Sequence, residues 1–222
     1  MRGWSDESLL ETYDLERRAA AIENIDVTSS TMDFLVPQNE SQRERRARIL
    51  DCALTDPSTK AQVDSGRLSE PFWYADSPLT TRSERRPCEG RPEKGKLPRP
   101  APGVLIPDAP VAVDGGATHL RALCRDGLTA LCGTSVNLDR VRQEMVEVVR
   151  VPVRVYRIGD IDVEGVIVDN LEPADDDVWL VRPDAYIAAV SSASDLEEVR
   201  GVACAAVTAT TGPGVRALSS SS

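Results

Sequence analysis

Apolar and charged residues recur with a helical period in the first part of the chain, and few strand patterns occur there. Between residues 8 and 20, apolar side chains fall on one side of a helix and charged side chains on the other. The apolar positions are Leu9, Leu10, Tyr13 and Ala20, and the charged ones are Glu11, Asp14 and Arg18. Ser5 is a suitable N-cap, because Asp6 and Glu7 then lie at the positive end of the helix dipole.

The helical pattern resumes and is punctuated twice further along. The stretch ENIDVTSSTMDFLV stops at Pro37, because the residue before a proline is disfavoured in the α region. Asn39 and Gln42 have the spacing of a capping box for a second helix, RERRARILDCAL. Asp56-Pro57 then opens a short helix that Gly66 closes. We therefore expect a helical segment over residues 1–74.

The second half of the chain alternates between strand and helix patterns. LTALC (128–132) is a short apolar strand, NLDRVRQEMVEVV is an amphipathic helix, and VPVRVYRI has the alternation of a strand. VWLV and YIAAV form a hairpin around a Pro-Asp turn, and Ser194 with Glu197 caps a last helix. This order predicts an α/β fold: a helical N-terminal segment followed by a thioredoxin-like domain, with a mixed four-stranded sheet between helices.

Proline content suggests where the two halves join. Six prolines lie among charged residues between 75 and 102, which favours an extended connector over a packed element. The predicted domains are a helical segment at 1–74, a Pro-rich linker at 75–102, a thioredoxin-like domain at 103–208 and a flexible tail at 209–222.

Composition and charge exclude several classes of protein. Hydrophobic residues make up 41% and charged residues 28% of the 222 residues, which is typical of a folded globular protein. The net charge of -10 disfavours nucleic acid and anionic lipid as partners, and the Arg clusters at 43–48 and 82–86 are expected to be solvated faces. No apolar run is long enough to cross a membrane. We expect a cytoplasmic protein with reduced cysteines.

Few residues are candidates for chemistry, and none is predicted to be catalytic, cofactor-binding or metal-binding. Cys132 follows the first strand of the second half, where a redox thiol would lie, but the nearest other thiol is Cys124 and no CxxC pair exists. The only histidine, His119, has no metal-ligand spacing around it, and Asp175 to Asp177 are expected in a solvated loop. GRPEKGKL (90–97) lacks the Ser or Thr of a phosphate-binding loop.

Three stretches resemble the C-terminal part of the FAD-dependent aromatic hydroxylases of the phenol hydroxylase and pentachlorophenol monooxygenase type. They are SLLETYDLERR (8–18), GVLIPDAPV (103–111) and VWLVRPDAYIAAV (178–190). With TMDFLVP they extend the resemblance from Ser8 to Val207. The resemblance implies helices that pack on a flavin-binding core and an appended thioredoxin-like domain. It also implies hydroxylation of a phenol- or polyketide-like ring with FAD, NAD(P)H and oxygen.

The flavin-binding sequence itself is not found. A dinucleotide fingerprint needs G-x-G-x-x-G between a strand and a helix, and the chain has no such run. We therefore expect a C-terminal portion or stand-alone relative of a flavin monooxygenase that binds no FAD and is inactive alone. The alternatives are a dimerisation or docking module for a separate flavin subunit and, disfavoured by the missing CxxC, a thiol oxidoreductase.

Two further expectations follow from the resemblance. The hairpin turn of the family reads RPDG, and this chain has Ala185 at the glycine position, where a left-handed backbone costs about 1 kcal/mol relative to glycine. The helical half has apolar residues whose counterparts pack on a flavin domain. We therefore expect self-association or a flavin-binding partner.

Overall fold

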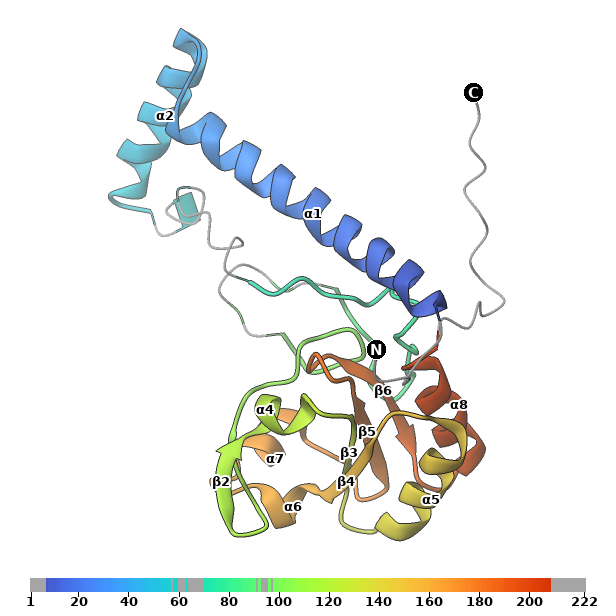
Figure 1. Ribbon diagram of the computed structural model, residues 1–222. Coiled ribbons are helices and arrows are strands. Elements are labelled where there is room, and N and C mark those ends of the chain that lie inside the picture. Colours follow the sequence, from blue (N-terminus) through green and yellow to red (C-terminus); the bar gives the residue numbers. More distant parts are fainter. Residues whose placement is uncertain are drawn as a thin grey trace. The chain divides into compact units, whose positions relative to one another are not determined.

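The computed structural model describes residues 7–56, 58–59, 63, 70–90, 92, 96 and 98–208 (Figure 1). Its contacts divide the chain into two compact units. A helical unit spans Leu15–Phe72 with Arg91–Leu97, and an α/β unit spans Met1–Asp14, Trp73–Gly90 and Pro98–Ser222. The predicted Ser5 cap, the end of the third helix at Gly66, most of GRPEKGKL and the tail at 209–222 lie outside the described residues.

The helical unit contains most of α1 (Ser8–Leu35) and all of α2 (Glu40–Ala53). The two helical stretches expected before Pro37 form one continuous helix. The predicted cap of α2 is confirmed, because Asn39 Oδ1 accepts a hydrogen bond from the Gln42 amide at 2.9 Å. The Gln42 side chain accepts in return from the amide of Gln38, at 2.6 Å. Two amides that would otherwise lack helical partners are thus satisfied.

A four-stranded sheet forms the centre of the α/β unit. Its strands are β3 (Leu128–Cys132), β4 (Val153–Arg157), β5 (Asp177–Val181) and β6 (Ile187–Ser192). Their order is β4-β3-β5-β6, with β3 parallel to β4 and the other pairs antiparallel. A parallel pair requires a crossover, which α5 (Leu138–Val148) supplies. The predicted α/β fold with a mixed four-stranded sheet and flanking helices is confirmed.

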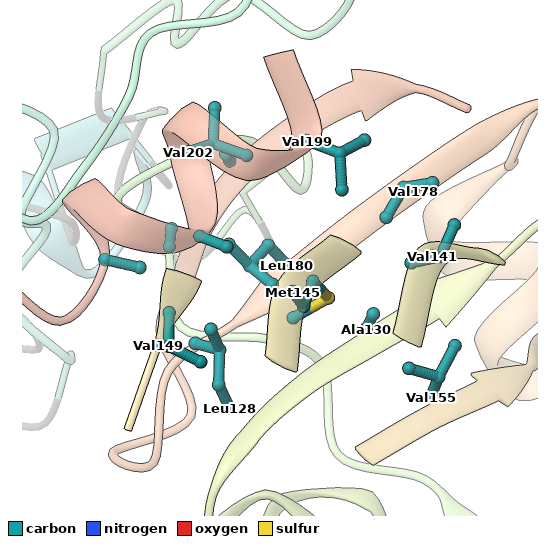
Figure 2. Close-up of a cluster of buried hydrophobic side chains, with 14 of the residues drawn as sticks. Leu128, Ala130, Val141, Met145, Val149, Val155, Val178, Leu180, Val199 and Val202 are labelled. Atoms are coloured by element: carbon teal, nitrogen blue, oxygen red, sulfur yellow. The ribbon is translucent and has the colours of Figure 1, made fainter. Parts of the chain in front are cut away.

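Each face of the sheet has its own hydrophobic core. On one face, α5 and α8 (Leu196–Ala205) cover a cluster that includes Val141, Met145 and Val199 against Leu128 and Leu180 (Figure 2). On the other face, three short helices cover the sheet. They are α4 (Leu120–Cys124), α6 (Ile158–Ile161) and α7 (Val166–Leu171). Because both faces are covered, the central strands are buried at every position.

Sequence reasoning missed several short elements on the second face. Besides α4, α6 and α7, they include a hairpin of β1 (Pro110–Val113) and β2 (Gly116–His119). Asp114 and Gly115 form its turn with φ of 52° and 77°. Positive φ at both central residues defines the turn type that an Asp-Gly pair favours, so the dipeptide was a usable signal.

The described residues of the Pro-rich segment form no helix or strand, but the segment is packed, whereas the sequence predicted an unpacked connector. The Thr81 amide donates to the Ala188 carbonyl at 2.8 Å, and the Gly103 amide donates to the Ile187 carbonyl at 2.7 Å. These hydrogen bonds pair backbone carbonyl groups at the outer edge of β6. Without them, the carbonyl groups would be exposed, as in an unpaired edge strand. Gly103 has φ of 89°, and a Cβ there would lie 2.4 Å from the Ala75 amide nitrogen. The close approach of the two chain segments thus requires glycine.

The last helix begins one residue later than predicted. Asp195, not Ser194, is the N-cap of α8, and its carboxylate accepts a hydrogen bond from the Glu198 amide at 2.9 Å. The Ser194 hydroxyl is instead 2.7 Å from the hydroxyl of Ser192. With the serine engaged by β6, the adjacent aspartate takes the capping position.

Candidate functional site

The candidate site lies where β3 ends and the chain turns toward α5. Arg157, at the end of the neighbouring strand, donates to the carbonyls of Gly133 at 2.7 Å and Val136 at 2.9 Å, and also to that of Thr134. A Cβ on Gly133 would lie 2.2 Å from the Ala174 carbonyl oxygen. A guanidinium and a close backbone crossing therefore hold this loop in one conformation.

Cys132 enters this loop as a buried thiol. Burial raises the pKa of Cys132 to about 12, against a smaller lowering by the charge of Arg157. Burial likewise raises the pKa of Cys124 to about 11, partly offset by a hydrogen bond with Thr129. The two thiols belong to the cores on opposite faces of the sheet. Since the thiolate is the reactive form, neither side chain is arranged for disulfide exchange.

Of the three aspartates after α7, Asp175 is exposed, but Asp177 is buried and so is not part of a solvated loop. The arginines at 82–86 are not all on a solvated face either. Asp177 is only 1% exposed, and its carboxylate accepts from Arg85 Nε at 3.0 Å and Nη2 at 2.8 Å. Arg85 also donates to Asp176 at 2.7 Å. The hydrogen bond from Ser192, followed by that from Arg85, lowers the pKa of Asp176. We call the contacts of Arg85 with Asp176 and Asp177 the clasp. The sequence could not reveal it, because Arg85 and the two aspartates are about ninety residues apart.

The next arginine covers a buried tryptophan. The guanidinium carbon of Arg86 lies 5.2 Å from the centre of the Trp179 ring, and its Nη2 lies 3.9 Å from Asp177. Arg86 also donates to the Glu172 carbonyl. Arg85 and Arg86 thus attach their segment of the chain to the ends of β5 and β6, through ion pairs and a cation–π contact.

A pocket of about 280 Å³ opens beside the clasp, between the beginnings of α5 and α8. It is lined by Ser135, Val136, Asn137, Arg140, Val141, Asp176, Ala193, Ser194 and Leu196. Asn137 caps α5 through the Arg140 amide at 3.0 Å, as Asp195 caps α8. The lining contains two serines, Ser135 and Ser194, and one carboxylate, Asp176, but no cysteine, histidine or lysine.

The remaining candidates lie elsewhere. His119 is exposed on β2, with Nδ1 3.5 Å from a carboxylate oxygen of Asp108. Within the described part of the chain, no three His, Cys, Asp or Glu residues are grouped so as to hold a metal ion. Among the same residues, no helix has both the length and the apolar character needed to cross a membrane.

The turn between β3 and α5 does not fit the pyrophosphate of a flavin dinucleotide. Pyrophosphate binding needs a glycine-rich turn between a strand and a helix, where the helix amides face the phosphates. The strand-to-helix turn after β3 has one glycine, and the space of its missing side chain is filled by carbonyl oxygens of Ala174 and Asp175. No step of flavin chemistry can be assigned to side chains of this turn.

Comparison with known proteins identifies the family to which the chain belongs. Residues 99–212 match the family described as aromatic-ring hydroxylase, C-terminal. The chain belongs to this family, and so constitutes a C-terminal domain of the flavin-dependent, aromatic hydroxylase-like monooxygenases. The resemblance seen in its sequence is confirmed. No curated protein matches the chain.

Three solved structures illustrate the similarity. A complex of aklavinone-11 hydroxylase with FAD and aklavinone matches 93% of this chain and 36% of its own, with 22% identity and a TM-score of 0.63. The flavin-dependent monooxygenase PieE, in complex with FAD and substrate, matches 91% and 40%, with 18% identity and a TM-score of 0.63. RebC soaked with chromopyrrolic acid matches 94% and 39%, with 21% identity and a TM-score of 0.64. The chain thus spans less than half the length of each.

Proposed function

We propose that the chain acts as the C-terminal portion of an aromatic-ring monooxygenase and is not catalytic alone. In this proposal the complete enzyme hydroxylates a phenol- or polyketide-like ring with FAD, NAD(P)H and oxygen, and a flavin-binding domain or subunit supplies the cofactor. The family match over residues 99–212 carries the proposal, together with the lack of a glycine fingerprint in the sequence. The cofactor would perform the oxidation, and this chain would contribute contacts and positioning.

The thioredoxin-like domain in this proposal has a structural and docking role. The order of β3, α5, β4, β5, β6 and α8 along the chain supports this assignment, but the loop where a redox pair would lie holds one buried thiol. A thiol oxidoreductase needs an accessible thiolate and a resolving thiol, so we place that function behind the docking role. We propose a cytoplasmic location, where the five free cysteines stay reduced.

The experiment that tests this function is a titration of the purified chain with FAD. We expect no stoichiometric flavin after desalting and no hydroxylation of phenol when NADPH and FAD are added. A yellow one-to-one complex would overturn the proposal that another domain holds the flavin. An insulin-reduction assay tests the alternative, and activity that disappears in Cys132→Ser would favour the oxidoreductase.

A further inference from the structure

A second pocket, of about 350 Å³, lies between α1 and α2 within the helical unit. Residues three and four apart share one face of a helix, so each wall of the pocket is a single helix face. The lining residues are Ser30, Asp33 and Phe34 on α1 and Gln42, Arg45, Arg46 and Ile49 on α2. We call this site the arginine pocket. Its volume lies within the range of sites that bind small molecules.

Arg46 departs from the solvated face that the sequence predicted for the arginines at 43–48. Its side chain is partly buried, and its Nε is fully buried without a hydrogen-bond acceptor. Arg43, by contrast, is exposed and pairs with Glu40 at 2.8 Å. A buried donor without an acceptor is unfavourable. A ligand in the arginine pocket that supplies an acceptor oxygen to Arg46 removes this defect.

Other groups in the lining are suited to the same kind of ligand. Arg45 adds a second guanidinium, and Ser30 adds a hydroxyl. Gln42 uses its Oε1 to accept from the Gln38 amide at 2.6 Å, so its side-chain amino group is left to donate. Asp33 is the one carboxylate of the lining, and it does not accept from Arg46 Nε. Two guanidinium groups against one carboxylate give the pocket a net positive charge.

We propose that the arginine pocket binds a phosphate group, whose oxygens accept hydrogen bonds from Arg45 and Arg46. A guanidinium presents its donors in a planar fork that matches phosphate oxygens, and such charge-assisted hydrogen bonds are strong. Phe34 and Ile49 form an apolar part of the lining, where the organic part of a phosphorylated small molecule packs. This site goes beyond the proposed function and does not depend on which domain holds the flavin.

Calorimetric titration of the full chain with inorganic phosphate, phenyl phosphate and benzyl alcohol tests the site. We expect phenyl phosphate to bind at least about tenfold more tightly than benzyl alcohol, and added salt to weaken its binding. Tighter binding of phenyl phosphate than of inorganic phosphate would support a phosphorylated small molecule as the ligand. Equal affinity of the two would support free phosphate. Binding of neither phosphate compound, or equal binding of phenyl phosphate and benzyl alcohol, would overturn the proposal.

Substitutions on α2 locate the site. Arg46→Gln should weaken the binding of phenyl phosphate at least about tenfold, because it removes the guanidinium that lacks an acceptor. Arg48→Gln is the matched control, since Arg48 is exposed on the same helix outside the lining and the substitution removes the same charge. It should change the affinity less than about twofold. Equal weakening by the two variants would show general attraction of anions to the helix and would overturn the proposal.

A substitution on α1 gives a readout that loss of folding cannot produce. Asp33→Asn removes the carboxylate that repels an anion in the arginine pocket, so it should strengthen the binding of phenyl phosphate at least about threefold. A weaker or unchanged affinity in this variant would contradict the placement of the phosphate between α1 and α2. FAD binding by the chain would overturn the proposed function alone, since none of these measurements involves flavin.

Discussion

The two units of the chain differ in how far their apolar residues are buried. In the α/β unit, β3 and β5 are buried at every position, and helices cover both faces of the sheet. In the helical unit, α2 has no fully buried residue, and α1 exposes most of its large apolar side chains. The first unit buries most of its apolar residues in its own core, whereas the second leaves several large apolar side chains exposed.

The largest expected difference between the units concerns their cysteines. Cys132 lies in the α/β core with its pKa raised to about 12 by burial, whereas Cys52 at the end of α2 is exposed. A pKa three units above 9.0 reduces the thiolate fraction about a thousandfold, and burial also blocks access. We expect maleimide to label Cys52 at least about a hundredfold faster than Cys132 at pH 8. Mass spectrometry of digested protein gives both rates, and comparable labelling would show that the core opens readily.

Two methionines test the comparison through stability. Met145 on α5 is fully buried in the core of Figure 2, whereas Met32 on α1 is 50% exposed. Met145→Ala should lower the free energy of unfolding by about 2–5 kcal/mol, because it removes buried side-chain atoms and leaves a cavity. Met32→Ala should change it by less than about 0.5 kcal/mol. Urea denaturation of both variants decides the matter, and equal losses would mean that Met32 is covered in the isolated chain.

Two ion pairs in the proline-containing segment, one with a buried carboxylate and one exposed, allow a second comparison of contributions to stability. Arg85 contacts the buried Asp177, while Arg82 contacts Asp76 with both side chains largely exposed. Asp177→Asn should destabilise the α/β unit by about 1.5–3 kcal/mol, because it weakens charged hydrogen bonds to the Arg85 guanidinium and the Ala174 amide. Asp76→Asn should cost no more than about 0.5 kcal/mol. Denaturant midpoints are the measurement, and similar costs would show that the clasp contributes no more than a surface pair.

Local signals predicted the elements that depend on neighbours in the sequence. Asn39 and Gln42 predicted the start of α2, and the apolar run LTALC and the alternation of VPVRVYRI predicted two strands of the sheet. The clasp of Arg85 on Asp177 was missed, because a charge run has the same sequence whether water or a distant carboxylate satisfies it. The packing of the Pro-rich segment was missed for a similar reason. Its hydrogen bonds go to β6 rather than to its own neighbours.

The smallest expected effect concerns the turn at Ala185, whose φ of 68° confirms the left-handed backbone that the sequence suggested. The Ala185 amide donates to the Arg182 carbonyl at 2.9 Å, and a residue with positive φ then completes the three-residue hairpin loop. Glycine at this position removes strain of about 1 kcal/mol. The structure adds an opposing effect, because the alanine methyl is only 5% exposed and packs in the core formed with Trp179 and Ile187.

Loss of that methyl costs about 0.8 kcal/mol, and the greater freedom of glycine in the unfolded chain costs about 0.4–1 kcal/mol more. We therefore expect Ala185→Gly to lower the free energy of unfolding by about 0.2–0.8 kcal/mol, although strain alone would predict a gain. Urea midpoints of the two proteins, compared at equal slopes, measure this balance. A gain near 1 kcal/mol would show that the methyl contributes little to the core. A loss of more than about 1 kcal/mol would show instead that the left-handed turn holds alanine with little strain.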